Sequence, residues 1–168
     1  MKIFTAAQIY EADKFTIQKQ QITFDDLMER VSIQIFNWLH SRLQGAQPKI
    51  HVFCGIGNNG GDGWVVAELA RQNNQEVTVW ALREPADLTG DAFKAAADCQ
   101  LEYQSNAPID NYDCILDAAF GSGLNQRIKG IHADAISWMN EQNAPVISVD
   151  IPSGLNGDTG QVMGCAVK

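Results

Sequence analysis

The chain has 168 residues, of which 45% are hydrophobic and 19% charged, and its net charge is −8. This length and composition are typical of a single soluble globular domain with a hydrophobic core. Lys and Arg form no cluster, which argues against a nucleic-acid-binding surface. No apolar run has the length of a membrane span, and the N-terminus lacks the apolar segment of a signal peptide.

The four cysteines show no C-x-x-C spacing, and Cys54 and Cys114 lie in apolar, strand-like runs. We therefore expect these two to be buried thiols in a protein of the reducing cytoplasm. The three histidines are scattered along the chain, so a zinc site is not expected.

Two capping patterns predict a pair of N-terminal helices. Thr5 is followed three positions later by Gln8, the spacing of a capping box. Thr23 precedes Asp25 and Asp26, whose charges favour the first turn of a helix. We expect Gly45 to end the second helix.

From residue 49 onwards, strand-like and helix-like segments alternate. The predicted strands are 49–54, 76–82, 101–103, 112–118 and 145–150, and the predicted helices are 63–73, 88–99 and 130–142. Such alternation indicates βαβ units and a mostly parallel sheet. The strands are continuous apolar runs, which is typical of strands covered by helices on both faces. The predicted class is therefore α/β.

The segment from Gly55 to Gly63 holds five glycines in nine positions. A glycine loop between a strand and a helix favours anion binding, and residues 55–60 have the G-x-G-x-x-G spacing of dinucleotide-binding folds. We expect this loop to continue to Gly63 before its helix begins, and Asp62 within it would repel a phosphate unless a cation or hydroxyl groups intervened. These two features differ from the ordinary dehydrogenase pattern.

Three loops rich in glycine and short oxygen-bearing side chains follow the predicted strands, at 55–63, 117–124 and 150–158. In an open parallel sheet, ligands bind outside the carboxyl ends of the strands. Oxygen ligands for Mg²⁺, Ca²⁺ or an alkali ion are available from Asn59, Asp117, Asp150 and Ser153. Strand-end aspartates also cap turns, so a purely structural role stays open for each. Residues 121–123 offer a second phosphate cradle, with Arg127 as a cationic partner.

At these positions the chain resembles the NAD(P)H-hydrate epimerase family, also called the YjeF N-terminal domain. The resemblance lies in residues 57–63 (GNNGGDG), 117–124 (DAAFGSGL) and 149–154 (VDIPSG), in the family's order. It implies a Rossmann-like three-layer α/β/α sandwich over residues 1–168, and a cytoplasmic isomerase that interconverts the R and S forms of NADHX and NADPHX. It also implies that the family's domain continues beyond the last residues of this chain.

The resemblance assigns site residues by position. The substrate contacts that it implies are Asn58, Asn59, Gly60, Gly61, Asp62, Gly121, Ser122, Gly123, Leu124, Asn125, Gln126, Arg127 and Asp150. The potassium ligands that it implies are Asn59, Asp117 and Ser153. The reacting carbon, C6 of the hydrated ring, carries a hydroxyl group and a ring nitrogen, so losing and regaining water would scramble its configuration. A carboxylate that moves a proton suits this step, and Asp150 is the candidate.

The expected partner is the small-molecule hydrate, with no nucleic acid and no membrane. The resemblance also leaves room for a homodimer and for an ADP-dependent dehydratase domain that follows on the same polypeptide. Two other functions stay open from the sequence. The chain could be an NAD(P)-dependent oxidoreductase, given G-x-G-x-x-G and the acidic Glu84, or a binding module without catalytic activity.

Overall fold

The structure is a computed structural model that describes residues 4–43, 48–107 and 111–168. Five parallel strands form one sheet in the order β3-β2-β1-β4-β5. The strands are β1 (Lys49–Cys54), β2 (Glu76–Ala81), β3 (Tyr103–Gln104), β4 (Cys114–Ala118) and β5 (Val146–Ser148). The helices are α1 (Ala6–Gln20), α2 (Phe24–Arg42), α3 (Asn58–Gln72), α4 (Gly90–Asp98) and α5 (Ile131–Glu141), with a short 3₁₀ turn, Pro85–Asp87.

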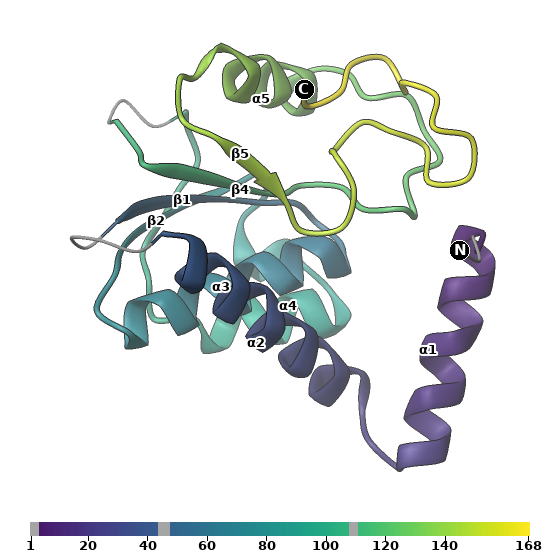
Figure 1. The fold of residues 1–168 in the computed structure, drawn as a ribbon. Coiled ribbons are helices and arrows are strands. Elements are labelled where there is room, and N and C mark those ends of the chain that lie inside the picture. Colours follow the sequence, from purple (N-terminus) through teal and green to yellow (C-terminus); the bar gives the residue numbers. More distant parts are fainter. Residues whose placement is uncertain (1–3, 44–47, 108–110) are drawn as a thin grey trace.

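Three layers are visible in Figure 1, where α2, α3 and α4 cover one face of the sheet and α5 covers the other. Each face has its own hydrophobic cluster. Leu39, Val52 and Trp64 belong to the first, and Phe53 and Met139 to the second. The prediction of an α/β/α sandwich with a parallel sheet is confirmed, and the strand order is the one seen in dinucleotide-binding folds.

The two predicted capping boxes are present. The Thr5 hydroxyl accepts the Gln8 N–H at the start of α1, and the Thr23 hydroxyl accepts the Asp26 N–H at the start of α2. Each cap satisfies backbone N–H groups that the first helical turn leaves unpaired. Gly45, expected to end α2, lies outside the described residues. Cys54 and Cys114 are buried free thiols, as predicted.

The start of α3 was predicted wrongly. The helix begins at Asn58 and not at Gly63, with Gly57 as its N-cap. The glycines inside it are required by close packing: a Cβ on Gly60 would lie 2.0 Å from the Gly55 carbonyl oxygen, and one on Gly63 would lie 2.6 Å from the Ala118 Cβ. The argument from loop length against a dinucleotide-binding corner therefore fails, because the helix starts directly after the second glycine.

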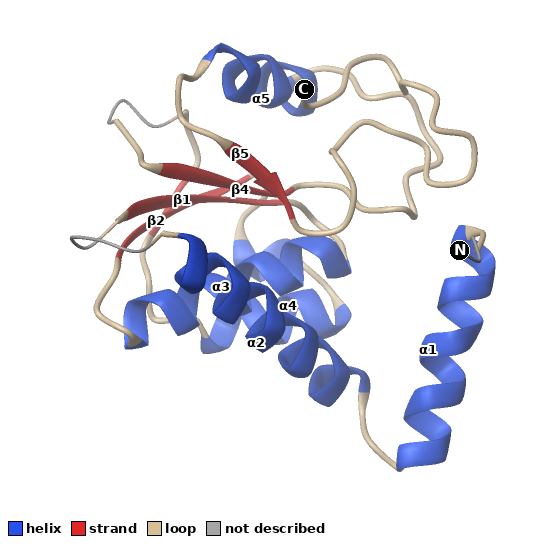
Figure 2. Cartoon of the chain, in the orientation of Figure 1, coloured by secondary structure: helices blue, strands red, loops and turns tan. Residues whose placement is uncertain are grey.

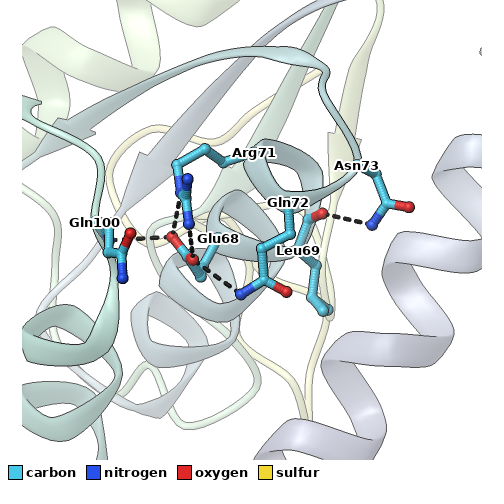
Figure 3. A network of polar contacts seen from close by, with 6 residues as sticks. All are labelled: Glu68, Leu69, Arg71, Gln72, Asn73 and Gln100. Atoms are coloured by element: carbon cyan, nitrogen blue, oxygen red, sulfur yellow. Dashed lines mark hydrogen bonds and ion pairs between the residues drawn. The ribbon is translucent and has the colours of Figure 1, made fainter.

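A polar network joins the end of α3 to the chain that leaves α4 (Figure 3). The Glu68 carboxylate accepts bonds from the Arg71 guanidinium at 2.6 and 2.9 Å, from the Gln72 amide at 2.9 Å and from the Gln100 backbone N–H at 3.0 Å. These donors lower the pKa of Glu68 to about 2, with Arg71 the largest cause. The network fixes α4 against α3 on one face of the sheet.

Helix α1 stands apart from the three layers, beside the carboxyl edge of the sheet (Figure 2). It has no buried residue, and the Ala6 N–H donates to Asp158 Oδ1 at 2.7 Å, which links its first turn to the C-terminal loops. In the part of the chain that the structure describes, no helix combines the length and the apolar character needed to cross a membrane.

Candidate active site

A cavity of about 900 Å³ opens at the carboxyl edge of the sheet. Its polar wall comes from the start of α3, from the loop after β4 and from the loop after β5, and its opposite wall comes from α1 and α2. The predicted substrate contacts that line it are Asn58, Asn59, Asp62, Gly121, Ser122, Gly123, Leu124, Asn125, Gln126, Arg127 and Asp150. Parallel pairing of β1 with β4 and of β4 with β5 gathers these three distant segments at one edge.

Two predicted contacts, Gly60 and Gly61, do not line the cavity. Both are buried in α3, where a Cβ on Gly61 would lie 2.7 Å from the Met28 Cε. Their position serves helix packing, and their role in substrate binding stays a prediction.

Asp117 and Ser153, two of the predicted potassium ligands, are fully buried beneath the cavity. Asp117 Oδ2 accepts the Ser153 N–H and the Ser148 hydroxyl, both at 2.9 Å, while Oδ1 accepts the Ser153 hydroxyl and the Ala119 N–H. Burial raises the pKa of Asp117, and these four donors oppose that rise. The carboxylate thereby ties the end of β4 to the loop after β5.

Gly121 lies between two polar side chains of the cavity. A Cβ there would meet Asp150 Oδ2 at 2.6 Å and Asn59 Oδ1 at 3.3 Å, so only glycine leaves both groups in place. Asp150 is exposed, and its Oδ2 accepts the Ser122 N–H at 2.7 Å. The Asn59 Nδ2 is buried and has no hydrogen-bond partner among the described residues.

Asp62 is half-buried between α3 and α2, on the wall of the same cavity. Its Oδ1 accepts the Ser32 hydroxyl at 3.2 Å. The pKa of Asp62 is raised to about 7, chiefly by burial and in addition by the charges of Asp150 and Asp13, while the Ser32 hydrogen bond opposes the rise. A carboxyl group that titrates near neutral pH suits proton transfer.

Sequence reasoning missed the wall that the two N-terminal helices provide. The residues of this wall are Ala6, Ile9, Tyr10 and Asp13 from α1 and Phe24, Leu27, Met28 and Val31 from α2. The sequence held one signal, because the apolar spacing of α1 is only partial and therefore does not predict a helix packed into the core. In the structure, Ile9 and Tyr10 are about half exposed. Lys129 was also missed, and it adds a second cation two positions after Arg127.

No three His, Cys, Asp or Glu side chains come together as a metal-binding group within residues 4–43, 48–107 and 111–168. The predicted potassium ligands are one carboxylate, one amide and one hydroxyl group, so the absence of such a His, Cys, Asp or Glu group neither supports nor excludes them. Asp117 and Ser153 are in direct contact, and Asn59 lies beside Gly121, the residue after Phe120, whose N–H donates to the Ser153 hydroxyl at 2.8 Å.

Comparison with known proteins gives one consistent picture. The NAD(P)H-hydrate epimerase of Limosilactobacillus fermentum is 38% identical over 98% of this chain and 80% of that protein. The bifunctional NAD(P)H-hydrate repair enzyme Nnr of Coxiella burnetii is 37% identical over 99% of this chain but only 35% of its own length. The crystal structure of yeast ynu0 superposes with a TM-score of 0.84 over 99% of this chain and 77% of that chain, at 21% identity, and therefore supports the fold alone.

The family described as YjeF-related protein N-terminus matches residues 24–168, which include all five strands and the three loops of the cavity. With the parallel sheet, the glycine-bounded start of α3 and relatives more than one-third identical, this match shows that the chain belongs to the YjeF-related N-terminal family.

Proposed function

We propose that this chain is an isomerase that interconverts the R and S forms of NADHX and NADPHX, as part of nicotinamide cofactor repair. The observation that carries the proposal is the cavity itself, in which the Asp150 carboxylate shares a wall with two glycine-bounded loops. The names of the relatives support the same reaction.

The cavity has the parts that a hydrated dinucleotide requires. The N-terminus of α3 presents unpaired backbone N–H groups to a phosphate, which is a common anion site. Arg127 and Lys129 supply positive charge at the same cavity, although the chain as a whole is acidic. Apolar side chains of α1 and α2 offer a surface for a ring system. We therefore assign Asn58, Asn59 and Asp62, residues 121–127 and Asp150 to substrate binding.

Asp150 is the proposed catalytic carboxylate. It is exposed to the cavity and held by the Ser122 N–H, so its second oxygen, Oδ1, is available to the substrate. A carboxylate placed in this way takes a proton from the water that adds to C6. Epimerisation follows when that water adds to the face opposite the one from which the hydroxyl left.

We further propose that Asn59, Asp117 and Ser153 hold a potassium ion. Two observations fit a cation there: the Asn59 amide has a buried atom without a partner, and Asp117 is a fully buried carboxylate. Rotating the Asn59 amide by half a turn directs its oxygen to the unpartnered position. Asp117 already accepts four hydrogen bonds, so its main contribution would be its negative charge. A bound cation would order the loops at this edge.

The test is a stereochemical assay. The chain is mixed with purified R-NADHX, and the appearance of the S form is followed after subtraction of spontaneous epimerisation. A rate well above the spontaneous one supports the proposal, and a rate equal to it refutes it. Following the absorbance of the reduced nicotinamide in the presence of candidate hydride acceptors distinguishes epimerisation from an oxidoreductase reaction.

A further inference from the structure

Three carboxyl groups line the cavity, Asp13, Asp62 and Asp150, and Asp62 differs from Asp150 in its burial and in its hydrogen-bond donor. It lies in α3, five residues after the N-cap, and packs against α2. Among the described residues, the Ser32 hydroxyl is the one hydrogen-bond donor to this carboxyl group, and no cation pairs with it. Asp150, by contrast, is exposed and bound by a backbone N–H.

The reaction needs two groups in opposite protonation states. The hydroxyl on C6 leaves as water only if a proton reaches its oxygen, and water that returns to C6 must lose a proton. The hydroxyl leaves from one face of the ring and water adds to the other, so a carboxyl group that lies on one side of the ring cannot serve both steps. Enzymes meet this need with two carboxyl groups whose environments separate their pKa values.

We propose that Asp62 is the proton donor of the epimerisation and that Asp150 is the matching base. This inference rests on the proposed function. Asp62 gives its proton to the C6 hydroxyl, the C–O bond breaks with its electron pair on the departing water, and the ring nitrogen lone pair forms a C=N⁺ bond. Water then adds to C6 from the other face, the C=N⁺ electrons return to nitrogen, and Asp150 takes the released proton. Exchange with solvent restores both groups, and the roles reverse for the opposite direction.

The surroundings of Asp62 keep this group protonated over a useful range of pH. Burial, opposed by the Ser32 hydrogen bond and aided by the negative charges of Asp150 and Asp13, raises its pKa to about 7. Asp13 belongs to α1, Ser32 to α2 and Asp150 to the loop after β5, so three elements around the cavity act on this carboxyl group. A donor active in its protonated form gives a rate that falls as pH rises above about 7.

The experiment compares Asp62→Asn with the parent chain in the R-to-S assay. Asparagine keeps the shape and the acceptor for Ser32 but carries no acidic proton, so the rate is expected to fall about 10²–10⁴-fold. Affinity for the hydrate and the melting temperature are expected to stay close to those of the parent. Turnover near the parental rate would overturn the proposal.

Two variants change the surroundings of Asp62 and are tested by the pH–rate profile. If Asp62 had a purely structural role, neither variant would shift this profile. Asp13→Asn removes a charge that raises the pKa of Asp62, so the alkaline limb of the pH–rate profile moves to lower pH. Ser32→Ala removes the hydrogen bond that lowers this pKa, so the same limb moves to higher pH. Glu11→Gln, an exposed change on α1 outside this cavity, is the control and leaves the limb in place.

The outcomes separate this proposal from the proposed function. If the parent chain converts R to S and Asp62→Asn does so equally well, the donor role fails and the epimerase function stands. An alkaline limb that stays fixed in both Asp13→Asn and Ser32→Ala also refutes the donor role. If the parent chain itself gives only the spontaneous rate, the function fails and the donor role fails with it.

Discussion

Ser153 donates both its backbone N–H and its side-chain hydroxyl to the buried carboxylate of Asp117. This double contact fixes the loop after β5 to the end of β4, two segments that lie 36 positions apart in the chain. The Ser153 hydroxyl also accepts the Phe120 N–H at 2.8 Å, so one side chain orders two of the three loops of the cavity. The proposed cation would lie beside this contact.

We predict that potassium raises the melting temperature of the chain more than sodium at equal concentration. A ligand that binds only the folded state stabilises it by mass action. Asn59→Ala should abolish the difference, because it removes a proposed ligand and leaves the hydrogen bonds of Asp117 intact. The matched control is Asn58→Ala, which changes the exposed neighbour. Equal melting curves in the two salts for the parent chain would contradict the site.

We predict that Asp150→Asn lowers the epimerisation rate about 10²–10⁴-fold, the usual loss on removing a general base. Hydrate affinity should change far less, because the amide oxygen can still accept the Ser122 N–H. The measurements are single-turnover rates and equilibrium binding of the hydrate on the same preparation. Near-parental turnover would remove Asp150 from the mechanism.

We predict that Gly121→Ala impairs catalysis without unfolding the chain. Its new methyl group would lie 2.6 Å from Asp150 Oδ2, so the carboxylate must leave its present position. A displacement of about 1 Å can cost about 10²-fold in rate. Gly123→Ala is the comparison, because a Cβ there meets no atom within 4 Å, and its loss should be much smaller. Equal rates in the two variants would show that the position of Asp150 is not critical.

We predict that Glu68→Gln destabilises the chain at neutral pH by about 0.5–1 kcal/mol, because solvent screens this i,i+3 ion pair and the amide keeps one acceptor oxygen. The folded-state pKa of Glu68 is about 2 against an ordinary value of 4.5, so the ionised form is the stabilised one. This contribution is complete above about pH 4.5 and is lost as pH falls towards 2. Urea unfolding at several pH values should therefore bring variant and parent together in acid. Glu29→Gln, on the exposed face of α2, is the control and should change stability little.

The sequence predicted the fold class and both helix caps because these depend on local patterns. Alternating apolar runs set the βαβ order, and Thr5 and Thr23 are recognisable from spacing alone. The start of α3 was not predictable in the same way. Glycine usually weakens a helix, yet Gly60 and Gly63 lie inside one because backbone and side chains of neighbouring segments leave no space for a Cβ. That requirement arises from tertiary packing, which cannot be inferred from the local sequence pattern.

The candidate site, too, was predictable from the sequence only in part. Residues after the carboxyl ends of β1, β4 and β5 were predicted to meet, and the structure brings Asn59, Gly121 and Asp150 to one cavity. The proton-donor role of Asp62 depends on burial and on the charge of Asp13 from α1. No spacing in the chain connects these two residues, so only their arrangement in space reveals it.

The strand order has a consequence for how the chain folds. β1 and β4 are neighbours in the sheet, yet Ile50 pairs with Cys114, so the central pairing joins segments that are far apart in sequence. Closing such a long loop has an entropic cost, and contacts of this kind slow folding. The cavity cannot exist before this pairing, because its walls follow strands on both sides of it. We therefore expect hydrate binding to appear late in refolding, after the helices have formed, so that a bound ligand would report completion of the native sheet.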